Sequence, residues 1–160
     1  MRGFLGLAVG ALLLLAGCAE DAEVVSEGEF LYFENIGMGQ AGSAADTTEW
    51  VLRDSVSWAS ASALLKPLAP FKKVDFSQSN VVAIGLPKES GGYHIEVESI
   101  ERAGGEVVVS YLLHVPANDC ITLAAMALPF VAVKVRRFDD EVVRFARRQQ
   151  RYECTWKQPS

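Results

Sequence analysis

The chain has 160 residues, half of them hydrophobic, and a formal net charge of −5. This length suits one domain, and this apolar content is enough to build its core. No internal repeat or low-complexity tract is visible in the sequence, which excludes a repeat protein.

The N-terminus resembles a bacterial export signal. Arg2 supplies a short positive region, and an apolar run follows over residues 4–16. The run is shorter than the roughly 20 residues that a membrane-spanning helix needs, so residues 1–17 are predicted to be a signal peptide. The end of the run, Leu15-Ala16-Gly17-Cys18, resembles the lipobox of bacterial lipoproteins, in which cleavage before the cysteine leaves it free for acylation. An ordinary signal peptide with an incidental cysteine is the alternative.

Acylation of Cys18 would tether the mature protein to a membrane that it does not cross, because several acyl chains exceed the threshold for stable anchoring. Ala19 stands where lipoproteins of the inner membrane often carry aspartate, so by resemblance the outer membrane is favoured. The protein would then face the periplasm or the cell surface, a location that disfavours nucleic acid as a partner. Residues 18–30 are acidic and aperiodic, which predicts a solvated tether ahead of a single domain over 31–157.

The first part of the domain combines short strands and one helix. Strands are predicted over 29–36 and 48–52, separated by a loop of small residues. A helix is predicted over 54–66, with Asp54 or Ser55 as its N-cap and Pro67 at its end. One face of this helix gathers three apolar residues, Trp58, Ala61 and Leu65.

From residue 81 onward the apolar period becomes two, which is typical of strands. A continuous apolar run predicts a central strand over 81–86. Residues 93–100 alternate, with Tyr93, Ile95 and Val97 on one face, and residues 107–115 return after a glycine-containing turn, which predicts a hairpin. Further strands are expected over 130–138 and 142–152. The predicted fold class is α+β, a mainly antiparallel β-sheet with one early helix packed against it.

Three cysteines are present, and lipidation would remove one of them. Cys120 and Cys154 then remain in an oxidising compartment, where an even remainder is typical of one disulfide. Two buried free thiols are the alternative.

Few residues suggest catalysis. His94 alternates with glutamates on a predicted exposed strand face, and His114 ends a strand, so both are interpreted as surface or structural residues. No serine stands in a nucleophile-elbow pattern, and no metal-ligand spacing or phosphate-binding loop occurs. We therefore predict no catalytic residue, metal site or cofactor.

Charge is unevenly distributed along the chain. The charged residues in 19–54 are almost all acidic, whereas residues 134–151 are rich in lysine and arginine. Lys134 and Arg136 fall opposite Val133 and Val135 on their strand, which predicts a basic face on the last two strands. Such a face could meet anionic headgroups or an acidic partner; an ordinary solvated sheet face is the alternative.

Several short motifs in residues 75–146 form a recognisable set: Asp75-Phe76-Ser77, the apolar run 81–86, Gly91-Gly92-Tyr93, Glu98-Ser99-Ile100, Cys120 and Pro129-Phe130. Together they resemble the C-terminal domain of the PrcB-like family of protease-complex subunits. Members commonly read Pro-Thr-Gly-Gly-Tyr at the loop, whereas this chain has Glu89-Ser90 before the glycines and its proline earlier, at Pro87. The resemblance implies an exported lipoprotein that helps a surface protease complex to assemble or persist and is not itself the protease.

The double glycine leaves two interpretations open. It permits the backbone angles of a tight turn into the hairpin strand, and it also predicts a candidate partner-binding loop: Lys88, Glu89, Ser90, Gly91, Gly92 and Tyr93. The predicted function is a non-catalytic accessory domain, with an exported protease or another envelope protein as its partner. The alternatives are a protease inhibitor that uses residues 87–93, since Gly-Gly-Tyr is similar to a loop of chagasin-like inhibitors, and a small envelope enzyme with an unrecognised site.

Overall fold

A computed structural model describes residues 28–154. The bounds of its elements are β1 Glu29–Phe30, β2 Phe33–Gly39, β3 Ala41–Gly42, β4 Thr48–Leu52, α1 Ser55–Ser62, β5 Leu65–Lys66, β6 Ser79–Gly85, β7 His94–Ala103, β8 Glu106–Pro116, β9 Phe130–Arg136 and β10 Val142–Tyr152. Strands dominate and the helix is small, so the α+β description fits with little α. Within these residues no helix is long and apolar enough to cross a bilayer.

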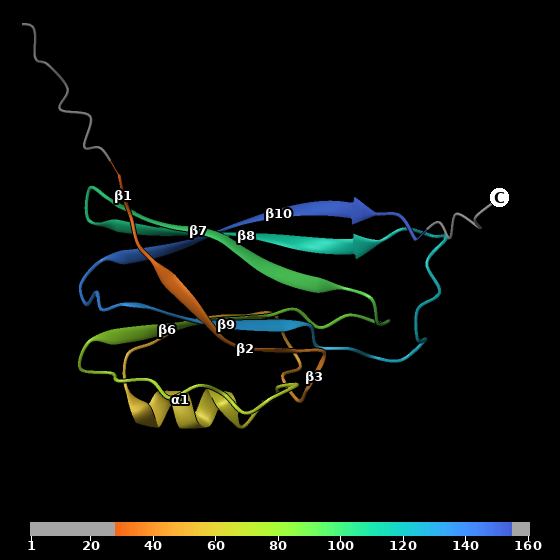
Figure 1. Cartoon of the computed structure of the whole chain (residues 1–160), viewed down its shortest axis with the longest axis horizontal. Coiled ribbons are helices and arrows are strands. Elements are labelled where there is room, and N and C mark those ends of the chain that lie inside the picture. Colours follow the sequence, from red (N-terminus) through yellow and green to blue (C-terminus); the bar gives the residue numbers. More distant parts are fainter. Residues whose placement is uncertain (1–27, 155–160) are drawn as a thin grey trace, which may run out of the picture.

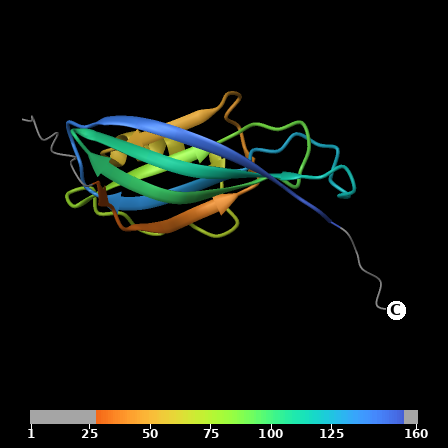
Figure 2. The same cartoon turned by 90° about the horizontal axis from the view of Figure 1, so that it is seen from above.

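The strands form two four-stranded sheets that pack face to face, rather than the one sheet that was predicted (Figure 1). Sheet A has the order β1-β7-β8-β10, and sheet B has the order β2-β9-β6-β4. A third, two-stranded pair joins β3 and β5. All pairs are antiparallel except β10 with β8, which is parallel over the whole length of β10. Viewed from above, β10, β8 and β7 run side by side, and β2 lies along the β7 side of the molecule (Figure 2).

The predicted hairpin is confirmed as β7 and β8. Gly104 and Gly105 both have positive φ in its turn, which glycine adopts without strain. A bulge between Val97 and Ser99 shifts the register by one residue. As a result, His94 lies opposite His114.

Sheet B is covered on both of its faces. Its valines 82, 131, 133 and 135 meet sheet A in the main core, whereas Val81, Ala83 and Ala132 face a second cluster that includes Ala61 of α1. The continuous apolar runs of β6 and β9 therefore mark strands that are buried on two sides. Strands β6 and β9 of sheet B therefore lie between two hydrophobic clusters.

The helix begins as predicted and ends earlier. Asp54 is the N-cap, since its Oδ1 accepts hydrogen bonds from the Val56 and Ser57 amides at 2.9 and 2.8 Å. However, α1 ends at Ser62, and Leu65 lies buried in β5 instead of on the helix face. The end therefore precedes Pro67, because the backbone at Leu65 is recruited into pairing with β3.

The predicted first strand, 29–36, is also divided between the sheets. Glu29 and Phe30 pair with β7, and the chain then crosses to sheet B, where β2 begins at Phe33. The buried Leu31, whose amide donates to the Ile100 carbonyl at 2.8 Å, sits at this crossing. Burial of Leu31 between the sheets requires the break in the strand.

One polar contact joins the two sheets through the core. The Tyr111 hydroxyl, on β8, donates to Glu49 Oε1, on β4, at 2.6 Å. Burial, and after it the hydrogen bond to Glu49, raises the pKa of Tyr111 well above its ordinary value. Tyr111 thus stays protonated and available as a donor.

Candidate partner-binding end surface

Two loops lie side by side at one end of the sandwich, at the right of Figure 1. The Lys88 amide donates to the Ala127 carbonyl at 2.8 Å, and the Ala127 amide donates back to Lys88 at 2.9 Å. The Gly91 amide adds a bond to the Leu123 carbonyl at 3.0 Å. We call the loops 88–93 and 120–127, with Tyr152 and Cys154 beside them, the end surface. They border a depression of about 550 Å³.

In the Gly91-Gly92 pair, Gly92 is the residue that the close packing of the two loops requires. Its φ is +89°, which confirms that the loop needs a residue in the left-handed region. A Cβ at Gly92 would also lie 2.8 Å from Thr122 Cγ2. The Tyr152 hydroxyl donates to the Gly92 carbonyl at 2.6 Å, so the C-terminal strand holds the same loop from a third side. The structural interpretation of the glycines is thereby supported.

Tyr93 faces both the core and the end surface. Its ring packs against the core between the sheets, on the side predicted from Ile95 and Val97, but it is only half-buried. The Lys88 ammonium lies 5.4 Å from the ring centroid, at cation–π distance. The Gln40 side-chain amide donates to the Tyr93 carbonyl at 2.7 Å. These contacts fix the loop as it enters β7.

The most exposed apolar side chains of the end surface were not singled out from the sequence. Ile121, Leu123 and Met126 are 99%, 79% and 83% exposed. They stand in a segment dominated by small residues that was interpreted only as a connection. The sequence signal that could have identified them is the presence of three large apolar residues in a predicted loop. The segment lacks the sustained alternation of apolar and polar residues that would bury them in a strand. A group of exposed apolar side chains on a protein surface is typical of an interaction site.

The predicted Cys120–Cys154 disulfide is confirmed, with 4.9 Å between the Cα atoms, and two free thiols are excluded. It joins the loop after β8 to the end of β10. The Ala117 amide donates to the Tyr152 carbonyl at 2.9 Å, and the Cys154 amide donates to Asp119 Oδ2 at 3.2 Å. The base of the loop 120–127 is therefore held at a fixed place.

The two histidines form a pair that the sequence did not reveal. His94 is exposed on the outer face of sheet A, as predicted, but its ring stacks on His114 with centroids 3.8 Å apart. His114 Nε2 lies 3.1 Å from Glu96 Oε2. Partial desolvation of its ring, and then the neighbouring His114, lower the pKa of His94. In residues 28–154 no three His, Cys, Asp or Glu side chains are grouped to hold a metal ion.

The basic face predicted for the last two strands is wrong, because β9 and β10 belong to different sheets. On β9, Lys134 Nζ lies 2.8 Å from Glu34 and Arg136 lies 2.9 Å from Glu29. Hydrogen bonds from Lys134, and then from a second lysine, lower the pKa of Glu34 to about 2. On β10, arginines 144 and 148 pair with glutamates 106 and 98. These cations sit in solvated ion pairs, which was the alternative interpretation.

Residues 81–136 contain both loops of the end surface, most of β6, and the whole of β7, β8 and β9. This stretch matches the PrcB C-terminal family model. The PrcB resemblance inferred from the motifs is thus confirmed over these residues, and the PrcB match includes strands of both sheets. Searches of curated proteins and of solved structures found no match.

The remaining site predictions concern the N-terminus. Cys18, the predicted acylation site, and the signal peptide over 1–17 lie outside the described residues. They stay predictions.

Proposed function

We propose that this chain is a non-catalytic accessory subunit of an envelope protease complex, tethered by acylated Cys18, and that it binds its partner through the end surface. The observation that carries the proposal is the group of exposed apolar side chains on loops that hydrogen bonds and a disulfide hold in place. Binding by a pre-ordered surface avoids much of the entropy cost of ordering it. The PrcB C-terminal match, which contains both loops, supports a protease complex as the setting.

The position of Glu29, near the start of the described residues, favours a protein partner over the membrane itself. Glu29 pairs with Arg102, next to the β7–β8 turn, whereas the end surface lies beyond the opposite ends of these strands (Figure 1). Strand β8 alone has 11 residues and so extends for about 36 Å. Tethering at Cys18 therefore attaches the domain by the end away from the end surface and leaves the loops 88–93 and 120–127 open to a partner.

The loop geometry also favours an accessory role over inhibition. An inhibitory loop has to project into a protease cleft, but residues 88–91 are bonded along the neighbouring loop, and three of them are half-buried. The two functions differ in a simple measurement. Titration of the purified chain into the partner protease would lower its activity if the chain is an inhibitor, and would leave or raise that activity if the chain is an accessory subunit.

The test is affinity purification of the whole chain from cell envelopes, followed by an assay of casein hydrolysis in the eluate. Joint replacement of the three exposed apolar residues, Ile121→Ser, Leu123→Ser and Met126→Ser, is expected to remove the co-purifying protease activity without lowering the melting temperature. The control replaces two exposed valines elsewhere, Val56→Ser on α1 and Val142→Ser on β10. Equal activity in both eluates, or none with the unaltered chain, contradicts the proposal.

The tether is tested separately. Metabolic labelling with a fatty-acid analogue should mark the unaltered chain and not Cys18→Ser. Label in both would rule out Cys18 as the anchor.

A further inference from the structure

We infer that the free edge of β7 binds an extended peptide segment in which a basic residue alternates with apolar ones. This site adjoins the end surface, since Gln40 and His94 line both depressions, but it is formed by other strands and does not depend on the protease assignment. It rests on three features of the β7 side of the sandwich: an unpaired strand edge, an apolar groove beneath it and, beside it, a carboxylate without a lysine or arginine partner.

The unpaired edge is the first feature. Sheet A ends at β1, but β1 covers β7 only at Glu101 and Arg102, with one further bond at Ile100. Over residues 94–97 no other strand of the described chain lies on that side of β7. Backbone groups at such an edge can hydrogen-bond an added strand.

The groove is the second feature. Strand β2 is the edge of sheet B on the same side, and the two edges border a groove of about 400 Å³. Ile95 and Val97 line it from β7, and Phe33, Phe130 and two valines of β9 line it from sheet B. Met38 and Leu68 stand at its mouth, 50% and 81% exposed. Every second side chain of an added strand would point into this apolar space.

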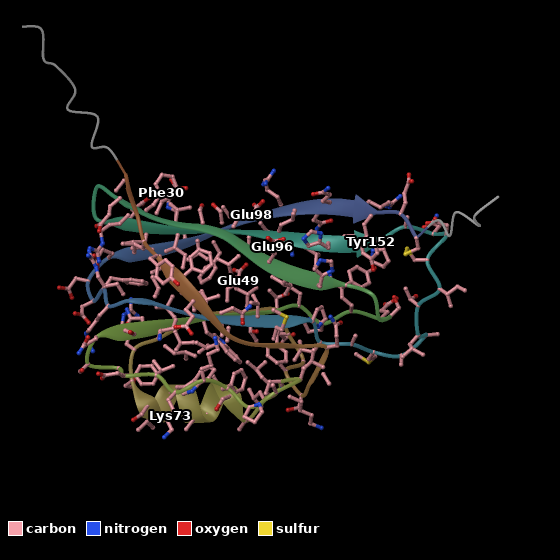
Figure 3. The ribbon with its side chains drawn as sticks, in the orientation of Figure 1. Phe30, Glu49, Lys73, Glu96, Glu98 and Tyr152 are labelled. Carbon is pink, nitrogen blue, oxygen red and sulfur yellow. A yellow bond between two sulfur atoms is a disulfide. The ribbon has the colours of Figure 1, made fainter. Side chains whose placement is uncertain are left out.

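The carboxylate is the third feature, and it sets the charge of the occupant. Glu96 and Glu98 project from the outer face of sheet A (Figure 3). Glu98 is paired with Arg148. Within residues 28–154 the one ion-pair partner of Glu96 is His114, whose Nε2 lies 3.1 Å away and which is charged only when protonated; Glu96 has no lysine or arginine partner, and its side chain is 63% exposed. The residue of an added strand opposite Glu96 lies on this outer face, where a lysine or arginine would be stabilised.

The same charges argue against a second copy of this chain as the occupant. If β7 paired with β7 of another molecule, Glu96 and Glu98 of each copy would face those of the other. Like charges across neighbouring strands are destabilising. The occupant is therefore a different segment, with the pattern apolar–basic–apolar.

The experiment measures binding of a fluorescein-labelled, end-blocked peptide of alternating valine and lysine to the whole chain in detergent, by fluorescence anisotropy. A valine–glutamate peptide is expected to bind about tenfold more weakly, because attraction at Glu96 becomes repulsion. Methylation of alternate peptide nitrogens should abolish binding, because it removes the donors to the β7 edge. Hydrogen–deuterium exchange should show protection of residues 94–97 by the valine–lysine peptide.

Charge reversal locates the site. Glu96→Lys should invert the preference between the two peptides, whereas Asp46→Lys, a change from acid to lysine at an exposed position outside both the groove and the end surface, should leave it unaltered. Equal binding of both peptides, an unchanged preference in Glu96→Lys, protection over 120–127 in place of 94–97, or no binding at millimolar peptide would each overturn the inference. None of these results bears on the serine variants of the end surface, so the two proposals fail independently.

Discussion

Replacement of Gly92 by alanine should destabilise the protein by about 2–3 kcal/mol. The φ of +89° costs an L-residue about 1–2 kcal/mol. The new Cβ would lie 2.8 Å from Thr122 Cγ2 and 3.3 Å from Pro116 Cγ, so the loop 120–127 must shift to admit it. We assign about 1 kcal/mol to that crowding, at the low end for overpacking because Thr122 can move.

Alanine variants of two other glycines separate the cost of backbone strain from the cost of steric crowding. Gly104 has φ +57° and no atom within 4 Å of a built Cβ, so Gly104→Ala isolates the backbone strain. Gly91 has no positive φ, and its nearest neighbour would be Leu123 Cβ at 3.8 Å. Gly91→Ala should therefore be neutral or slightly stabilising, since alanine lowers the entropy of the unfolded chain.

Thermal and urea unfolding give the order. Melting temperatures should fall in the sequence Gly91→Ala, Gly104→Ala, Gly92→Ala, with a loss of about 6–10 °C for the last. In a Thr122→Ser background, which removes Cγ2, the cost of Gly92→Ala should shrink toward that of Gly104→Ala. If Gly92→Ala is as stable as Gly91→Ala, the described loop conformation is wrong.

Three further outcomes are expected. Joint replacement of Cys120 and Cys154 by serine should cost about 3–4 kcal/mol in unfolding experiments, because the bridge closes a loop with a sequence separation of 34; an unchanged melting temperature would refute this. Tyr111→Phe should cost about 1 kcal/mol through loss of the bond to Glu49, and Glu49→Gln, which keeps an acceptor, should cost less; the reverse order would contradict the assigned donor. His94 takes up a proton at lower pH in the folded than in the unfolded chain, so its contribution is intact above pH 6.5 and is lost as the pH falls below that value. The urea midpoint should therefore drop between about pH 7.5 and about pH 5.5, and drop less in His94→Gln; equal slopes would exclude His94 as the cause.

Local signals in the sequence were sufficient for individual elements. Asp54 or Ser55 was the predicted start of the helix, the glycine-containing turn predicted the β7–β8 hairpin, and the apolar run 81–86 predicted a central strand. Each of these elements is determined by residues that are close in sequence, so local composition and the spacing of apolar residues are enough to predict it.

Pairing between distant strands could not be predicted in the same way. Alternation shows which face of β10 is polar, but it does not show that β10 leaves β9 and pairs in parallel with β8. The same limit explains why the basic face was predicted wrongly, since β9 and β10 lie in different sheets. It also explains why the histidine stack was not predicted, since the stack depends on a one-residue bulge near Glu98. The exposed loop residues, such as Ile121, were missed because their exposure depends on what the rest of the chain leaves uncovered.

The disulfide makes the end surface sensitive to the redox state of the chain. Strands β8 and β10 are parallel, so both finish at the same end of the sandwich, and Cys120 and Cys154 join the segments that leave them. In a chain whose thiols are reduced, the loop 120–127 keeps its hydrogen bonds to the loop 88–93 but loses its covalent link to the segment that follows β10. The arrangement of the exposed apolar group would then depend on the redox state of Cys120 and Cys154, so a reducing environment should weaken binding of a partner to the end surface.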